Sequence, residues 1–180
     1  MRRNKFLKTM ALGAGAFSLS SFKDIKSQGN RNKLVNVKPK IVRDDEGQKL
    51  LTLGDNQTIK LKGEDTNGQF TLIEELNEPG IFIPPHVHSN EDEVFHVISG
   101  SLEVTVGSET TILGAGDMVF CPREIPHSWK TIGPGKTRVF LSIFPSGLEN
   151  LFTEISKLPS NPPDIEKVMG IAEKYKIKFI

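Results

Sequence analysis

The sequence predicts an all-β domain followed by a short helical segment. Between Leu34 and Pro145, short stretches that suit β-strands alternate with turn sequences rich in Gly, Asn, Asp and Pro. Many short strands at this spacing favour an antiparallel sandwich or barrel. The chain has 180 residues, of which 37% are hydrophobic and 25% charged, as expected for one globular domain with a hydrophobic core.

Ten strands are expected in the domain at 34–145, separated by turn sequences such as Gly54-Asp55-Asn56 and Ser99-Gly100. In order, they are 49–53, 57–62, 69–76, 80–87, 93–99, 101–106, 109–114, 117–121, 127–131 and 137–144.

The pattern changes to a helical period in residues 146–180. Ser146 and Glu149 have the spacing of a capping box, with Ser146 as the N-cap of a first helix. Apolar residues then recur at helical spacing, at Leu148, Phe152, Ile155 and Leu158 and again at Ile165, Val168, Met169 and Ala172. We expect two helices and a last strand within residues 176–180.

The first 26 residues resemble an export signal. Arg2, Arg3, Lys5 and Lys8 form a basic head, and a weakly apolar stretch follows at 9–22. The paired arginines are similar to a twin-arginine signal, and the alternative is an amphipathic helix. We therefore expect a protein exported to the periplasm or secreted, with a linker at 27–33. No Cys follows the apolar stretch, so we expect no membrane anchor.

Charge and cysteine content exclude some functions. Residues 1–26 contain six basic residues and one acidic residue, so the remainder has 17 basic and 21 acidic residues and a net charge of −4. A mildly acidic domain without a basic stripe is a poor candidate for binding nucleic acid. Cys121 is the only cysteine, which rules out a disulfide within the chain, and its apolar surroundings predict a buried core residue.

Three of the chain's four histidines and one glutamate have the spacing of a metal site. His86 and His88 lie two apart in a predicted strand, so their side chains share one face. Glu93 begins the next strand, and His127 follows Pro126. This ligand set suits one divalent transition metal: Fe, Mn, Ni, Co, Cu or Zn. The alternative is a hydrogen-bonded polar cluster that holds no metal.

These residues belong to two motifs that resemble those of the cupin superfamily. The first has Gly80, His86, His88, Glu93 and Gly100, and the second has Gly116, Pro122, Pro126 and His127. The chain departs from the second motif at Glu124, where cupins usually have glycine, and at Thr131, where they often have asparagine. The resemblance implies a jelly-roll β-barrel over residues 34–145 with a metal inside it.

The segments 84–100 and 144–149 further resemble single-domain cupins similar to quercetin 2,3-dioxygenase. That resemblance implies a metal-dependent oxidoreductase that uses dioxygen and a flavonol or another aromatic hydroxy compound. It also implies that Glu93 is a metal ligand and the catalytic acceptor of a substrate proton. Two alternatives remain: an isomerase-type metal cupin, and a cupin that binds a metal or small ligand without catalysis.

Strand parity separates His96 from the site. Because Glu93 points inward, Val94, His96 and Ile98 are expected to point outward. This partly apolar face should be covered by N-terminal strands, C-terminal helices or a second subunit, and we expect a homodimer. Arg123 is expected in an exposed turn rather than on an anionic substrate. Most strand aromatics are expected in the core, namely Phe70, Phe82, Phe95, Phe120, Trp129, Phe140 and Phe144.

Overall fold

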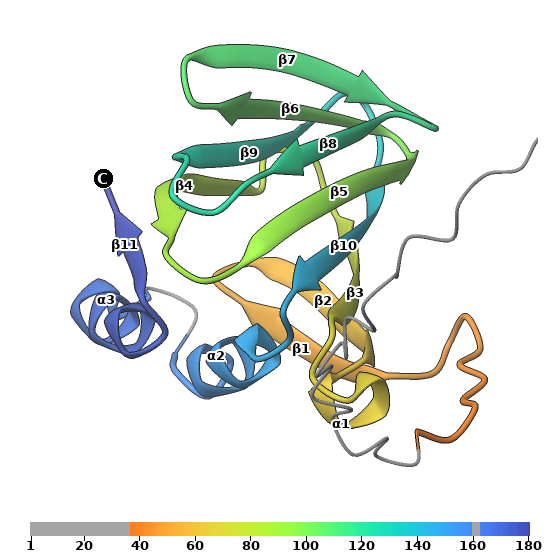
Figure 1. Ribbon diagram of the computed structural model, residues 1–180. Helices are drawn as coiled ribbons and strands as arrows, with labels where there is room; N and C mark the ends of the chain where they lie inside the picture. The colour runs from red at the N-terminus through yellow and green to blue at the C-terminus, as the bar shows by residue number, and fades with distance from the viewer. Residues whose placement is uncertain (1–36, 160–162) are drawn as a thin grey trace, which may run out of the picture. The chain divides into compact units, whose positions relative to one another are not determined.

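The computed structural model describes residues 37–159 and 163–180, which form two antiparallel sheets and three short helices (Figure 1). The expected signal peptide at 1–26 and the linker at 27–33 lie outside the described residues. The six-stranded sheet has the order β1-β2-β3-β10-β5-β8, and the five-stranded sheet has the order β11-β4-β9-β6-β7. The strands are β1 (Gln48–Thr52), β2 (Asp55–Leu61), β3 (Thr71–Asn77), β4 (Phe82–His88), β5 (Asp92–Ser99), β6 (Ser101–Val106), β7 (Glu109–Gly114), β8 (Met118–Cys121), β9 (His127–Ile132), β10 (Thr137–Phe144) and β11 (Ile177–Phe179).

All ten strands expected at 49–144 are present, with bounds that differ by at most two residues. From β3 to β10 the chain crosses between the two sheets at almost every connection, and only β6 and β7 are successive strands of one sheet. This is the connectivity of a jelly roll and confirms the predicted fold class. Strands that follow one another in sequence, such as β4 and β5, therefore belong to opposite walls of the core.

Alternation of side chains builds the core between the sheets. On β5, Phe95 and Val97 are buried, and on β6 Leu102 and Val104 are buried, while the residues between them are partly exposed. Successive side chains of a strand point to opposite faces, so each strand contributes one apolar face. The same parity decides which polar residues enter the core.

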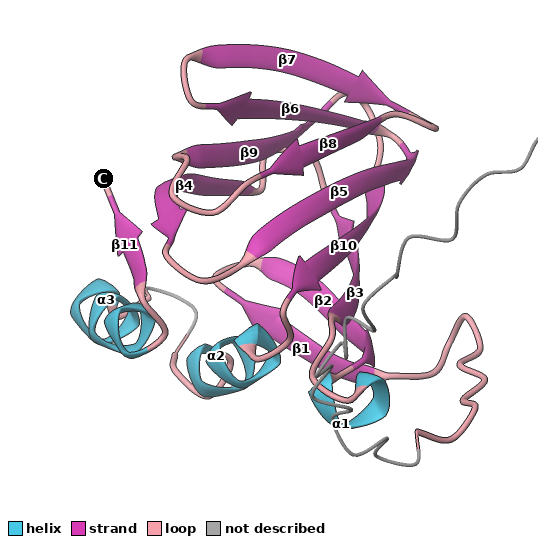
Figure 2. Cartoon of the chain, viewed as in Figure 1, coloured by secondary structure: helices cyan, strands magenta, loops and turns pink. Residues whose placement is uncertain are grey.

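Three helices gather at one end of the strands (Figure 2). They are α1 (Gly63–Thr66), which the sequence did not predict, α2 (Leu148–Ile155) and α3 (Ile165–Lys174). α2 buries Leu151 and Ile155, and α3 buries Val168 and Ala172. β11 then pairs with β4, so that Phe179 lies opposite His86 and Ile177 opposite His88. No helix among the described residues is long and apolar enough to cross a membrane.

The predicted capping box is wrong. The N-cap of α2 is Gly147, and no side chain caps it. Glu149 instead accepts hydrogen bonds from the Gly63 amide at 2.8 Å, the Thr71 hydroxyl at 2.5 Å and the Gly147 amide at 2.7 Å. The Glu149 carboxylate thus links α2 to the start of α1 through Gly63 and to β3 through Thr71.

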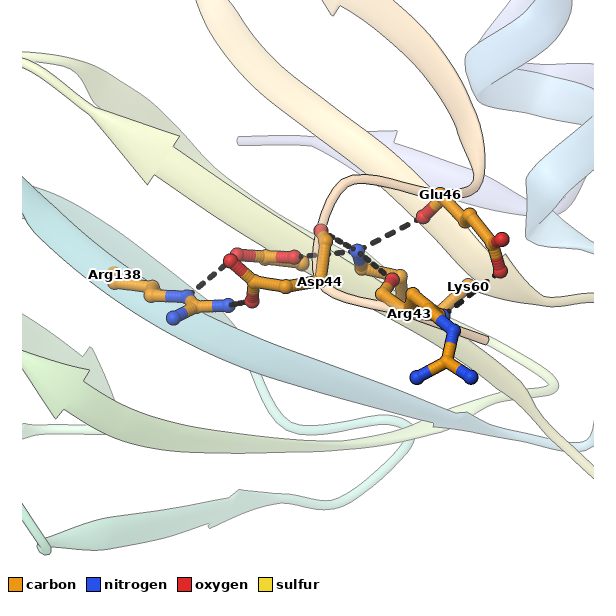
Figure 3. Close-up of polar contacts among 6 residues, drawn as sticks. Arg43, Asp44, Glu46, Lys60 and Arg138 are labelled. Carbon is orange, nitrogen blue, oxygen red and sulfur yellow. Dashed lines mark hydrogen bonds and ion pairs between the residues drawn. The ribbon is translucent and has the colours of Figure 1, made fainter. Parts of the chain in front are cut away.

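A buried lysine fastens the segment that leads into β1. The Lys60 ammonium on β2 donates to the backbone carbonyls of Arg43, Asp44 and Glu46 at 3.3, 2.6 and 2.9 Å, and it pairs with Glu74 at 2.9 Å (Figure 3). Arg138 on β10 bridges the Asp44 and Glu74 carboxylates, and Figure 3 shows its contact with Asp44. The 43–46 turn is thus held on the outer face of the sheet by charged hydrogen bonds.

We expect Lys60→Met to lower the free energy of unfolding by about 2 kcal/mol, because it leaves several carbonyls without a donor while Arg138 still neutralises Glu74. The control is Lys62→Met, whose partner Glu64 is 71% exposed and whose ion pair should contribute at most about 0.5 kcal/mol. Urea denaturation of both variants makes the comparison, and equal losses would contradict the assignment.

Candidate metal centre

Three strands from both sheets bring the four predicted ligands together. His86 and His88 end β4, His127 begins β9, and Glu93 lies at the start of β5 in the opposite sheet. His86 pairs with His127 across the β4–β9 ladder. All four residues are buried, and one ligand atom from each lies within 4.8 Å of all the others. The cluster could therefore hold a single metal ion.

Backbone carbonyls orient two of the imidazoles. His86 Nδ1 lies 2.9 Å from the Pro84 carbonyl, and His127 Nδ1 lies 3.3 Å from the Ile125 carbonyl. A carbonyl only accepts hydrogen bonds, so each Nδ1 is the protonated nitrogen. The Nε2 of each neutral ring keeps a lone pair that can bind a metal. This outer hydrogen bond is the arrangement that fixes the tautomer of metal-ligating histidines.

His88 provides the test of whether a metal fits. Neither of its ring nitrogens has a hydrogen-bond partner among the described residues, although the side chain is 3% exposed. Its Nε2 lies 3.8 Å from Glu93 and its Nδ1 lies 3.7 Å from Glu91, both too long for a hydrogen bond. Buried polar atoms are rarely left unpaired, and a cation bound by Nε2 and Glu93 would satisfy Nε2. The donor set fits a divalent transition metal.

The protonation states also suit metal binding. Burial, reinforced by His127, lowers the pKa of His86 to about 4, so this imidazole is neutral near pH 7. Burial alone would raise the pKa of Glu93, but the charge of His88 and the hydrogen bond with His127 lower it to about 2. Glu93 Oε2 lies 2.9 Å from His127 Nε2. Glu93 is thus an ionised carboxylate among imidazoles.

A cavity of about 70 Å³ adjoins the cluster. Its lining includes His86, His88 and Glu93, and most of the remaining surface is apolar. The C-terminal elements α2, α3 and β11 contribute the residues Leu151, Phe152, Ile155, Ala172, Ile177 and Phe179. This volume accommodates several water molecules.

An ion pair links the two loops that deliver Glu93 and His127. Arg123 donates to Asp92 from its backbone amide at 2.9 Å and from its guanidinium at 3.0 and 2.7 Å. These hydrogen bonds lower the pKa of Asp92 to about 2. Arg123 is 45% exposed and is not among the residues that line the cavity, which agrees with its predicted place in an exposed turn.

The two departures from the second motif have structural explanations. Glu124 adopts a left-handed backbone conformation with φ of 64° and donates its amide to the His88 carbonyl at 2.8 Å. This is a conformation that glycine adopts without strain. Thr131 donates its hydroxyl to the Glu78 carbonyl at 2.7 Å and accepts from the Ile81 amide at 3.0 Å, so it holds the turn before β4.

We expect Glu124→Gly to raise the free energy of unfolding by up to about 1 kcal/mol. The substitution removes a left-handed cost of about 1–2 kcal/mol, offset by the larger backbone entropy of unfolded glycine. Glu124→Ala is the matched control, since it removes the same side chain and keeps the unfavourable φ. Thermal and urea unfolding of both variants decide the point, and a glycine variant no more stable than the alanine variant would show the strain to be negligible.

Predictions for residues around the cluster have mixed outcomes. His96 lies on the outward face of β5, as predicted, beside Met118 of the edge strand β8. Cys121 is buried as expected, and burial raises its pKa to about 12. Within residues 37–159 and 163–180, Met118 and Phe120 on this outward face are more than half exposed. That a second subunit covers the face stays a prediction.

The prediction that most strand aromatics are core residues is wrong. Phe95 and Trp129 are buried, and both line the cavity. Phe70 and Phe140 are partly buried, and Phe82, Phe120 and Phe144 are exposed. β-propensity places aromatic residues in strands but does not choose the face. The other aromatic residues of the lining, Phe152 and Phe179, come from the C-terminal segment. The local sequence pattern did not reveal that this segment packs against the cavity.

Sequence analysis also missed buried polar residues. Glu91, between β4 and β5, is 8% exposed and lies beside His88. Thr52, Asp55, Gln57 and Glu75 enter the cavity lining from β1, β2 and β3. Strand alternation could have revealed the residues of β2 and β3. Asp55 and Gln57 on β2, like Glu75 and Asn77 on β3, occupy inward positions where an apolar residue is usual.

Comparisons with known proteins agree with this geometry. Residues 73–144, which include all four clustered side chains, match the cupin domain family. Quercetin 2,3-dioxygenase from Bacillus subtilis (strain 168) is 28% identical over 126 residues, which are 70% of this chain and 36% of that protein. The chain thus spans about a third of the length of that relative.

Two solved structures have the same fold. KdgF from Halomonas sp. superposes with a TM-score of 0.56 at 18% identity, over 63% of this chain and 99% of that one. A predicted oxalate decarboxylase from Thermotoga maritima superposes with a TM-score of 0.54 at 18% identity, over 58% and 98%. The family match over residues 73–144, the jelly-roll fold and the two motifs agree, so residues 73–144 are similar to the cupin domain family.

Proposed function

We propose that the protein is a metal-dependent oxidoreductase of the dioxygenase type that acts on a flavonol or another aromatic hydroxy compound. The observation that carries the proposal is the buried cluster of three imidazoles and one carboxylate beside a largely apolar cavity. The similarity to quercetin 2,3-dioxygenase supports the reaction class. The metal is one of Fe, Mn, Ni, Co, Cu and Zn.

His86, His88, Glu93 and His127 would hold the metal, which when bound polarises a coordinated substrate oxygen and favours reaction with dioxygen. Glu93 faces the cavity as an ionised carboxylate, so it can accept the proton of a substrate hydroxyl placed beside it. Phe95 and Trp129 offer apolar surfaces to an aromatic ring. Phe152 and Phe179 of the C-terminal segment add apolar surface to the same cavity.

The isomerase-type alternative would act on an anionic sugar phosphate and would need basic residues in the cavity. No Lys or Arg lines the cavity among residues 37–159 and 163–180, whereas Asp55, Glu75 and Glu93 do. This acidic lining disfavours an anionic substrate. The non-catalytic alternative predicts a fully loaded metal site without turnover.

Metal analysis of the purified protein together with oxygen uptake on flavonols and simple phenols tests the proposal. We expect about one transition metal ion per chain and oxygen consumption that stops when a chelator removes the metal. Stoichiometric metal without oxygen uptake on any of these compounds would refute the dioxygenase and leave the metal site intact.

A further inference from the structure

A second polar region lies on the wall of the same cavity. Asp55 and Gln57 enter it from β2, Glu75 from β3, and Thr52 from the end of β1. All four are at most 4% exposed. They interrupt a lining that is otherwise apolar apart from the metal cluster.

Three of these side chains belong to a closed hydrogen-bond network. Thr52 donates to Gln57 at 3.1 Å, and Gln57 donates to Asp55 at 2.7 Å. The second oxygen of Asp55 accepts from Asn77 at 2.5 Å. Both carboxylate oxygens of Asp55 thus have amide donors, and the network is fixed in place without any contribution from a ligand.

Glu75 is the exception. It lies directly opposite Gln57 in the β2–β3 ladder and is 2% exposed, yet it has no hydrogen bond or ion pair within the described residues. A buried carboxyl group without a partner is costly, and buried polar groups are nearly always satisfied. Because Glu75 lines the cavity, water or a ligand inside the cavity can supply this partner.

Strand register separates Glu75 from the metal ligands. Glu75 pairs with Val139, which pairs with Val97, four residues along β5 from Glu93. Four residues of strand correspond to roughly 13 Å of backbone, a gap that the two inward side chains shorten. A ligand in contact with the metal cluster at one end can therefore present its other end to Glu75.

The charge of this region limits what that end can be. Burial, followed by the charges of Asp55 and Glu93, raises the pKa of Glu75 well above its usual range. A neutral carboxylic acid both donates and accepts, as a hydroxyl group does. An anionic group would lie against Asp55 and Glu93 without a basic partner.

We propose that Glu75, placed beside the Asp55–Gln57–Asn77 network, forms a polar subsite that binds an uncharged hydroxyl group at the far end of the substrate. The subsite selects neutral hydroxylated aromatics over their anionic and apolar analogues. The assignment rests on the proposed function in taking this cavity as the substrate site, but it does not depend on turnover.

A series of four phenols that differ only at the para position tests the subsite: 4-hydroxybenzyl alcohol, 4-methylphenol, 4-hydroxybenzoate and 4-hydroxybenzylamine. Trp129 lines the cavity and is the only tryptophan of the chain, so its fluorescence reports binding to anaerobic, metal-loaded protein. We expect the alcohol to bind about tenfold more tightly than each of the other three.

Two substitutions assign the preference to Glu75. Glu75→Gln should keep it, because an amide also donates and accepts, whereas Glu75→Leu should abolish it without weakening 4-methylphenol binding. Glu109→Gln, on the exposed strand β7, is the control and should change nothing. A leucine variant that still prefers the alcohol, a wild-type preference for the amine or the benzoate, or no binding of any of the four would overturn the proposal. Absence of oxygen uptake would count against the dioxygenase alone.

Discussion

Replacing His127 by alanine is expected to weaken metal binding by more than about 100-fold. His127 is 2% exposed, its Nδ1 is held by the Ile125 carbonyl and its Nε2 faces Glu93, so its removal takes one imidazole ligand from the cluster. Loss of an outer partner of a ligand typically costs 10–100-fold in metal affinity, and loss of the ligand itself should cost more. Metal content after dialysis against a weak chelator measures the effect.

His96→Ala is the matched control for this experiment, since His96 lies on the outward face of a ligand-bearing strand. It should retain the full metal content. Thermal unfolding provides a second measurement: metal at 100 times its dissociation constant stabilises a folded protein by about 2.7 kcal/mol, and this gain should vanish in His127→Ala only. If His127→Ala binds metal stoichiometrically, or His96→Ala loses it, the ligand assignment is wrong.

Glu93→Gln should reduce oxygen-dependent turnover per bound metal by about 100-fold or more. The substitution keeps the shape of the side chain and removes the ionised oxygen that would accept the substrate proton, a role that typically contributes 10²–10⁴-fold. The side chain should keep its place at the start of β5 beside His127. Expressing the rate per bound metal separates proton transfer from any loss of metal affinity.

Glu91→Gln is the companion variant, because Glu91 is also buried and lies on the other side of His88. We expect its turnover per bound metal to stay within about tenfold of wild type, since its carboxylate can only orient the imidazole. Glu93→Gln with full turnover would remove the catalytic role of Glu93, and equal losses in both variants would indicate a shared effect on His88.

The strands and the metal cluster were predictable because both depend on short-range pattern. The two-residue period of a strand requires His86 and His88 to share a face, and it sends Glu93 inward and His96 outward. The motif resemblance added His127, which lies about 30 residues further along the chain. The alternation alone could not have shown that β4 and β5 belong to opposite sheets whose inward faces meet.

Other features depended on contacts between segments distant in sequence. Glu149 has the spacing of a helix cap, but donors from Gly63 and Thr71 occupy its carboxylate. Phe120 and Phe82 have high strand propensity, but their positions on outward faces leave them exposed. The hydrogen-bond partners of Glu149 and the exposure of the two phenylalanines were therefore set by tertiary contacts and by the face on which each side chain lies. Neighbouring residues in the sequence encode neither.

The sequence by itself determined the strand order along the chain, the parity of each strand and the four side chains of the candidate metal centre, because these follow from local periodicity and motif spacing. Tertiary structure alone decided what surrounds that centre. The C-terminal helices and β11 line its cavity, and β2 and β3 bring Asp55 and Glu75 to the opposite wall. These placements depend on packing between sheets and helices, which no local pattern specifies.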